Sequence, residues 1–315
     1  MKSFNEVYEQ VHKESFHELE MLRKKRNKQI FLLMSIIALI IGTVVVLANG
    51  YSNIDHFKFG MFGYMAFFFS LIIILIVVRK SKYTPMFKEK AIKPFIKNMD
   101  ENFEYNPKGG ISSVVYRQGE FERYDRYYAE DLITGKLDGK YNFQMSEVHT
   151  EEESTDSDGN TSTYTLFHGL FGLVECAKDI GTTFKIRLDK GVLEKLFKGK
   201  TKVEMDSQEF EKYFDVYGDN KIVVMQLLTS DVMNTMMDFI KQSRIKYEIT
   251  IKSDEMYIRF HTGNMFEPKL FKSSLDYNML KEYYDIIKFD QLLERRWRPY
   301  KFGNRRKTIW RRSWC

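Results

Sequence analysis

The chain has 315 residues, a net charge of +6 and two cysteines, Cys176 and Cys315. Two cysteines are too few for a disulfide framework or for a zinc site made of cysteines alone. Nine Lys and Arg residues and no acid lie between Arg295 and Cys315, so a basic C-terminal tail sets the positive charge. The rest of the chain is net acidic, which excludes a domain that is basic throughout.

Residues 1–29 carry apolar side chains at three- and four-residue spacing, which predicts an amphipathic helix. A basic cluster at its end suits a helix that lies on the inner membrane surface. Packing of this helix on a cytoplasmic domain is the alternative, and the pattern does not decide between the two.

Two uncharged apolar runs, residues 30–48 and 60–78, follow this segment. As a helix each run would span about 28 Å, close to the hydrocarbon thickness of a bilayer. Lipid offers no partner to backbone groups, so both runs must be helical if they lie in a membrane. The sequence therefore predicts a transmembrane hairpin over residues 30–78. Two core helices of a soluble protein are the alternative.

The charges beside the runs predict the orientation of this hairpin. Lys and Arg cluster before the first run, between Arg23 and Lys28, and after the second, between Arg79 and Lys90, whereas the loop carries only Lys58 against Asp55. Basic residues stay on the cytoplasmic side during insertion. We therefore expect a cell-membrane protein with two spans and both termini in the cytoplasm.

Residues 79–104 are predicted to form a helical connector from the membrane to a soluble domain. Its apolar pattern runs from Met86 to Phe103. Pro94 lacks a backbone donor, so it should kink or restart the helix.

Residues 105–294 are predicted to form a cytoplasmic α+β domain with antiparallel sheet, which could divide into two subunits near residue 205. Its first half has strand signals at 114–116, 141–145 and 165–174. The polar stretch 151–163 has Asp158-Gly159 at its centre, which predicts a mobile hairpin tip.

The second half of the domain alternates between strand and helix signals. Gly218-Asp219-Asn220 predicts a hairpin between strands 213–217 and 222–228. Thr229 is placed to cap a helix with an apolar stripe that ends at Ile240. Two alternating strands, 247–251 and 256–260, and a last helix, 277–294, complete the domain.

The soluble region contains the short blocks Asp125-Arg126-Tyr127, Glu130-Asp131, Gly135-Lys136, Glu209-Phe210-Glu211 and Phe266-Glu267-Pro268, in this order. Together these blocks resemble a bacterial family of two-span membrane proteins that is defined only by a domain of unknown function. The resemblance covers residues 88–284 and also includes Phe167-His168-Gly169-Leu170-Phe171. It implies a membrane location, a cytoplasmic domain and no established activity. Because such proteins are often encoded near LemA-type membrane proteins, it also implies a partner of that type. The matching residues, which we expect to be structural, are Asp125, Arg126, Tyr127, Glu130, Asp131, Gly135, Lys136, Ser146, Glu147, Glu209, Phe210, Glu211, Phe266, Glu267 and Pro268.

The sequence carries no signature of catalysis, of a cofactor or of a metal centre. Glu130 and Asp131 are adjacent and should point in different directions, which argues against a paired acid and base. His149 and His168 have no third ligand at metal-binding spacing, so we interpret both as isolated polar side chains. Cys176 has no paired histidine that would make it a nucleophile.

The tail, residues 295–315, combines its cationic side chains with all three tryptophans. Basic-aromatic segments bind anionic phosphates, and anionic lipid headgroups are the expected partner. A solvated tail is the alternative, and nucleic acid is disfavoured. The candidate headgroup ligands are Arg295, Arg296, Arg298, Arg305, Arg306, Arg311 and Arg312.

The sequence thus predicts an integral membrane protein whose cytoplasmic domain binds or scaffolds a partner. The alternative is a membrane-bound enzyme with its site at Asp125–Asp131. Carboxylates that converge on a pocket would favour the enzyme, whereas a flat apolar patch would favour partner binding.

Overall fold

The computed structural model describes residues 1–50, 68, 72, 82–176, 179–188, 201–269 and 272–297. The chain divides into two compact units. Unit 1 comprises Met1–Pro107 and Phe266–Lys281, and unit 2 comprises Lys108–Met265 and Glu282–Cys315. The expected α+β class is confirmed: a long N-terminal helix precedes an antiparallel sheet with helices.

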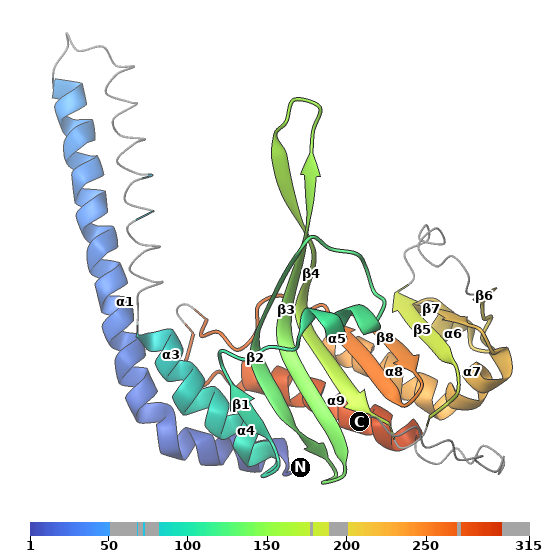
Figure 1. Ribbon diagram of the computed structural model, residues 1–315. Helices are drawn as coiled ribbons and strands as arrows, with labels where there is room; N and C mark the ends of the chain where they lie inside the picture. Colours follow the sequence, from blue (N-terminus) through green and yellow to red (C-terminus); the bar gives the residue numbers. More distant parts are fainter. Residues whose placement is uncertain are drawn as a thin grey trace, which may run out of the picture. The chain divides into compact units, whose positions relative to one another are not determined.

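Unit 1 begins with a single helix, α1, which runs over Phe4–Gly50 (Figure 1). The N-terminal helix and the first apolar run, predicted separately, are therefore continuous. The polar half packs within unit 1: Phe4, Val7 and Val11 are buried, and the Phe4 ring contacts the Phe95 ring at 6.4 Å between centroids. These contacts favour the packed alternative for residues 1–29.

By length and composition, α1 could cross a membrane. Its second half exposes Phe31, Leu32 and Leu39, which are 73%, 61% and 70% exposed, unlike the side chains of a core helix. The second apolar run and the loop before it lie outside the described residues, apart from Phe68 and Ile72.

The connector is helical, as predicted, and Pro94 marks a change within it. Unit 1 continues with α3 (Tyr83–Phe87), the π-helical turn η1 (Lys88–Ile92), α4 (Lys93–Met99) and the strand β1 (Glu104–Asn106). Pro94 lies in the first turn of α4. A π-turn just before a proline accommodates the change in helical hydrogen bonding that the missing N–H of the proline causes.

Unit 2 is built on antiparallel strands in the order β2-β3-β4-β9-β8-β5-β7-β6. Strands from both sides of residue 205 therefore belong to one sheet. Their bounds are β2 Arg126–Leu137, β3 Tyr141–Thr155, β4 Thr161–Glu175, β5 Thr183–Leu188, β6 Thr201–Lys202, β7 Phe214–Gly218, β8 Tyr247–Lys252 and β9 Glu255–Phe260.

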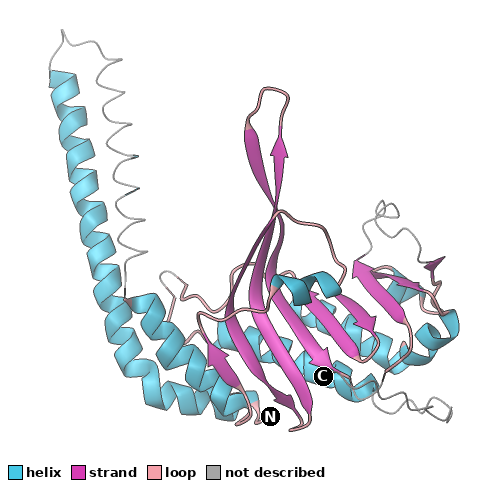
Figure 2. Cartoon of the chain, viewed as in Figure 1, coloured by secondary structure: helices cyan, strands magenta, loops and turns pink. Residues whose placement is uncertain are grey.

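Helices cover both faces of this sheet (Figure 2). On one face, Phe239 of α8 stacks on Phe289 of α9, and both rings contact Tyr247 of β8. On the other face, Tyr116 of α5 packs against Phe171 in an aromatic core. The helices are α5 Ser113–Gln118, α6 Gln208–Glu211, α7 Lys221–Leu227, α8 Ser230–Ser243 and α9 Tyr277–Trp297, the last of which continues from unit 1 into unit 2.

Two predicted strands are helices, and a side-chain cap explains each difference. The Ser112 hydroxyl accepts a hydrogen bond from the backbone N–H of Val115 and starts α5 where a strand was expected at 114–116. The Asn220 side chain accepts from the N–H of Val223 and starts α7 where a strand was expected at 222–228. Capping satisfies orphan backbone donors and here outweighs the strand preference of the β-branched residues that follow.

The polar stretch 151–163 is a hairpin, but most of it is paired strand. β3 and β4 remain paired as far as Thr155 and Thr161, beyond a register shift between Thr150 and Glu151. The Asp156 side chain closes the turn by accepting hydrogen bonds from the backbone N–H groups of Asp158 and Asn160. The hairpin projects beyond the rest of the sheet (Figure 1).

Candidate functional site

A pocket opens on unit 2 where β2, β3 and β4 lie side by side. Its volume is about 290 Å³. Antiparallel register brings Tyr128, His149 and His168 into one row across the three strands. Their rings form a ladder, with 6.0 Å between the Tyr128 and His149 centroids and 4.7 Å between the stacked His149 and His168 rings. The lining residues are Tyr128, Ala129, Glu130, Glu147, His149, His168 and Asn264.

Glu147 anchors the pocket from below the surface. Glu147 is 5% exposed, and each of its carboxylate oxygens has a polar partner. His168 Nε2 lies 2.9 Å from Oε1, and the backbone N–H of Met265 donates to Oε2 at 2.7 Å. The two partners hold the Glu147 side chain in place, and Glu147 in turn fixes the orientation of the imidazole.

The surroundings of both imidazoles favour the neutral form. Burial lowers the pKa of His149, and the neighbouring His168 lowers it further. Burial also lowers the pKa of His168, against the opposing charge of Glu130. Because Glu147 accepts from Nε2 of His168, the neutral ring carries its proton there and has Nδ1 as a hydrogen-bond acceptor.

The segment 261–265 supplies one wall of the pocket because a glycine lets it approach β4. A Cβ at Gly169 would lie 2.0 Å from the carbonyl oxygen of Phe260 and 2.9 Å from the amide nitrogen of Thr262. Gly263, at φ +70°, donates its N–H to the carbonyl of His168. Asn264 and Met265 are thereby placed beside the two histidines.

The pocket can bind a small polar group but is not a metal centre. Its lining combines two carboxylates with two neutral imidazoles and contains no Lys or Arg. Among the described residues, no group of three or more His, Cys, Asp and Glu side chains is arranged to hold a metal ion.

The Asp125–Asp131 block does not converge on one site. Asp125 accepts a hydrogen bond from the backbone N–H of Glu153, exposed Arg126 pairs with the Glu153 carboxylate, and the Tyr127 hydroxyl donates to the Ile111 carbonyl. Of the block, Tyr128, Ala129 and Glu130 line the pocket, whereas Asp125, Arg126, Tyr127 and Asp131 do not.

Four further sequence-selected residues lie along β2 and β3. Asp131 is buried with φ +59° at a break in the register between Glu130 and Ile133. Gly135 and Lys136 continue β2, and the buried Ser146 hydroxyl accepts from the N–H of Ile111. Asp131 and Ser146 are therefore buried within the fold and do not line the pocket.

The matching residues Glu209–Glu211 and Phe266–Pro268 make contacts within the fold and do not line the pocket. In unit 2, Phe210 stacks against Phe214, Glu209 pairs with Lys241 at 2.5 Å, and Glu211 accepts from the N–H of Met205. In unit 1, Phe266 is buried beside Tyr105, and Glu267 pairs with the buried Lys88 at 2.8 Å. Pro268 follows and is half-buried.

Two of the candidate lipid ligands are paired with acids on the protein. Arg295 lies 2.5 Å from Asp138, and Arg296 pairs with Asp231. Trp297, the end of α9, is buried and donates its indole N–H to the Leu227 carbonyl. Arg298, Arg305, Arg306, Arg311 and Arg312 lie outside the described residues.

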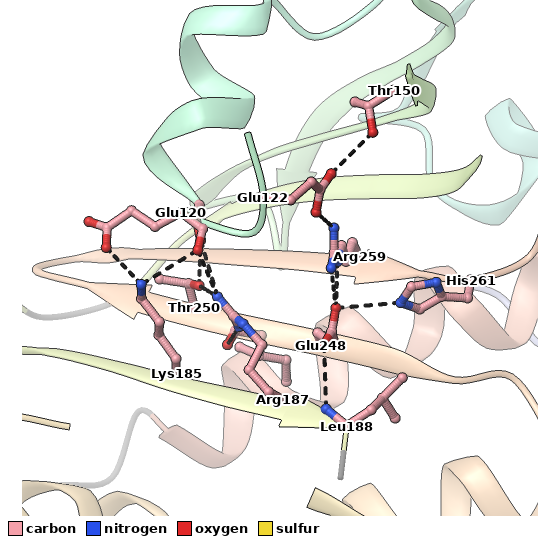
Figure 3. A network of polar contacts seen from close by, with 12 residues as sticks. Glu120, Glu122, Thr150, Lys185, Arg187, Leu188, Glu248, Thr250, Arg259 and His261 are labelled. Atoms are coloured by element: carbon pink, nitrogen blue, oxygen red, sulfur yellow. Dashed lines mark hydrogen bonds and ion pairs between the residues drawn. The ribbon is translucent and has the colours of Figure 1, made fainter. Parts of the chain in front are cut away.

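A buried charge network occupies the opposite face of the sheet (Figure 3). Arg259 of β9 bridges Glu248 of β8 and Glu122, and its Nε lies 2.6 Å from Glu248. Burial works to raise the pKa of Glu248, but Arg259, His261 and Arg187 outweigh it, and the pKa is lowered. Arg187 of β5 donates to Thr250 at 2.7 Å and to the Ile249 carbonyl at 2.6 Å.

The network fixes the segment after α5 to the sheet. Two guanidinium groups lie over the Phe121 ring, that of Arg187 at 4.6 Å and that of Arg259 at 4.5 Å from its centroid. Glu120 pairs with Lys185 at 2.8 Å. Because carboxylates of the segment pair with these cations, the network is a structural connection and not an open site.

Sequence reasoning missed both the histidine pair and this network. Asp158-Gly159 predicts a hairpin that brings His149 and His168 close, but a register shift between Thr150 and Glu151 decides which residues pair. Glu248 and Thr250 alternate with apolar residues and suggest a solvated face, yet α5 and the segment after it cover that face.

The chain matches a family model described as "Protein of unknown function (DUF3137)" over residues 165–293. This match includes β4 and its histidine but not β2. No curated protein matches the sequence. Among solved structures, the mycobacterial trehalose monomycolate transport factor A, TtfA, is similar at 8% identity and a TM-score of 0.32, over 59% of this chain and 88% of that chain. This likeness is too low to place the two chains in one fold.

Proposed function

We propose that this protein is anchored in the cell membrane by two spans, with both termini in the cytoplasm, and that its α+β domain binds a small polar ligand. The exposed apolar second half of α1 and the basic flanks of both apolar runs support the anchor. Headgroup binding by the basic tail and association with a LemA-type protein are compatible additions, and neither is needed for ligand binding.

The observation that carries the binding proposal is the pocket on β2, β3 and β4. Ligand sites are concave and contain a few oriented polar groups. Here a buried carboxylate, Glu147, holds His168 in place, while Glu130 and Asn264 border the opening. A pocket of about 290 Å³ is at the small end of ligand sites, which limits the bound portion to a small group.

Native mass spectrometry of the full-length protein, released from membranes in mild detergent, tests this proposal. Asn264→Trp fills the opening, and Lys136→Trp adds the same bulk to an exposed position of β2 outside the lining. We expect a small-molecule adduct on the wild type and on Lys136→Trp that is lost from Asn264→Trp. Absence of any adduct, or its retention on Asn264→Trp, would contradict the proposal.

General acid–base catalysis is the second candidate function, because carboxylates do converge on the pocket. His168 is oriented by a buried carboxylate at 2.9 Å, an arrangement that also prepares an imidazole to take up a proton. A catalytic role predicts that the bound molecule is turned over and that His168→Gln retains binding but stops turnover. Recovery of an unchanged ligand from the wild type after prolonged incubation favours the binding module.

A further inference from the structure

We infer that the pocket selects an organic cation, a guanidinium or ammonium group, over neutral and anionic groups of the same size. This inference rests on the proposed function and names the chemical class of its ligand.

The charged residues around the pocket favour a cation. Glu130 and Glu147 are the acidic residues of the lining, and Glu151 lies 3.5 Å from His149 just beyond it. The nearby cation Arg126 pairs with Glu153 on the hairpin. An anion in the pocket would face carboxylates without a compensating Lys or Arg in the lining, whereas a cation is attracted by them.

Hydrogen bonding is the second argument. Guanidinium and ammonium groups only donate, so they require acceptors. Glu130 offers carboxylate oxygens, Asn264 an amide oxygen, and neutral His168 its Nδ1. The proton on Nε2 of His168 is directed to Glu147, so the main donor of this ring is already used within the protein.

The ring ladder is the third argument. Tyr128 is 51% exposed at the pocket edge, and its face continues the row of His149 and His168. Tyrosine faces attract cations, and a planar guanidinium can also stack on them. Charge, acceptors and rings therefore favour the same class of ligand.

The test titrates full-length protein in detergent with ethylguanidinium, with its neutral analogue N-ethylurea and with propionate. Binding is followed through the ¹³Cε1–H resonances of His149 and His168. We expect saturable shifts of both resonances with ethylguanidinium and none with the other two at equal concentration. Glu130→Gln should weaken ethylguanidinium about tenfold, the loss expected for one hydrogen bond to a charged group.

Glu152→Gln is the matched control because it removes the same charge from an exposed position of β3 outside the lining. It should leave the affinity within twofold of wild type. An equal loss in both variants would show attraction by overall charge and would overturn the inference. Stronger binding of ethylurea or propionate would overturn it too, while leaving the binding proposal intact. If none of the three probes binds while the native adduct is retained, the inference is likewise overturned and the binding proposal is left intact.

Two sources can supply such a cation: a free small amine or guanidine, or a basic side chain of a peptide. A pentapeptide with one central arginine, compared with its citrulline form, separates them. Affinity at least tenfold above ethylguanidinium assigns a peptide partner, and equal affinity assigns a free small molecule. Both results require that the citrulline peptide fails to bind, and binding of citrulline would overturn the inference.

Discussion

Arg126 and Arg259 both pair with glutamates, but the two pairs differ in their exposure to solvent. Arg126 lies on the edge of the hairpin with half of its side chain exposed, whereas Arg259 is 7% exposed and contacts Glu122, Glu248 and the Phe121 ring. An exposed pair is screened by water, while breaking a buried pair leaves an uncompensated charge. The residue that stabilises the domain is therefore Arg259.

Arg259→Ala should destabilise the protein by about 3–5 kcal/mol, because buried Glu248 and half-buried Glu122 lose their partner. Arg126→Ala should leave the melting temperature close to that of the wild type. Thermal unfolding of both variants in detergent, followed by circular dichroism, checks this order. A larger effect for Arg126→Ala would show that the hairpin edge carries the stability.

Asp290 of α9 is fully buried, and neither carboxylate oxygen has a hydrogen-bond partner among the described residues. Burial raises the pKa of this carboxyl well above its ordinary value. Its surroundings are apolar on the sheet side, where a Cβ at Gly172 would lie 3.1 Å from Oδ2, 3.2 Å from Ile258 and 3.4 Å from Met145. Burial therefore favours the protonated form of this carboxyl in the folded protein.

Asp290→Asn should become more stable relative to the wild type as the pH rises. Above the unfolded pKa of about 4, the folded wild type holds a proton that the unfolded chain has released, so its unfolding free energy falls with increasing pH. Asparagine has no such proton. Melting temperatures of both proteins at pH 5 and pH 8 measure the difference. An equal difference at both values would show that Asp290 does not titrate in this way.

At the scale of the elements, local signals predict some segments and miss others for definite reasons. α8 follows from the Thr229 cap and an apolar stripe, and β8 and β9 follow from alternation. Ser112 and Asn220 cap α5 and α7 in the same way, but the β-branched residues after each cap favour a strand in the sequence pattern. The register of β3 with β4, which creates the histidine pair, depends on a shift that no local pattern reveals.

Gly169→Ala should destabilise unit 2 by about 1–3 kcal/mol and disturb the pocket. The added Cβ would lie 2.0 Å from a backbone carbonyl on Phe260, so the segment 261–265 must move. Gly42→Ala is the control, because nothing lies within 4 Å of its Cβ position in α1 and alanine favours helix. Thermal unfolding checks the stability, and the ring resonances of His149 and His168 check the pocket. Unshifted resonances in a destabilised variant would separate this glycine from the site.

At the scale of the molecule, the sequence predicts location better than chemistry. A span needs only length and apolar composition, which are local properties. A pocket needs residues from three strands and a returning segment, which only the folded chain brings together. Residues 125–131 show why adjacency in the sequence does not predict a site. Their closeness along the chain suggested one site, but strand β2 separates Asp125 from Glu130, and Asp131 is buried.

The orientation of the chain in the membrane is the last prediction. Basic flanks on both apolar runs predict that the connecting loop is outside the cell and unit 2 inside. Single cysteines at Ser52, in the loop, and at Ser157, in the exposed hairpin turn, report these two sides. The background carries Cys315→Ser, while Cys176 can stay because burial raises the pKa of its thiol to about 12 and keeps it unreactive. An impermeant maleimide on intact cells should label Ser52→Cys at once and Ser157→Cys only after the membrane is opened. Labelling of Ser157→Cys on intact cells would place the pocket outside, and labelling of neither variant after opening would exclude an exposed hairpin.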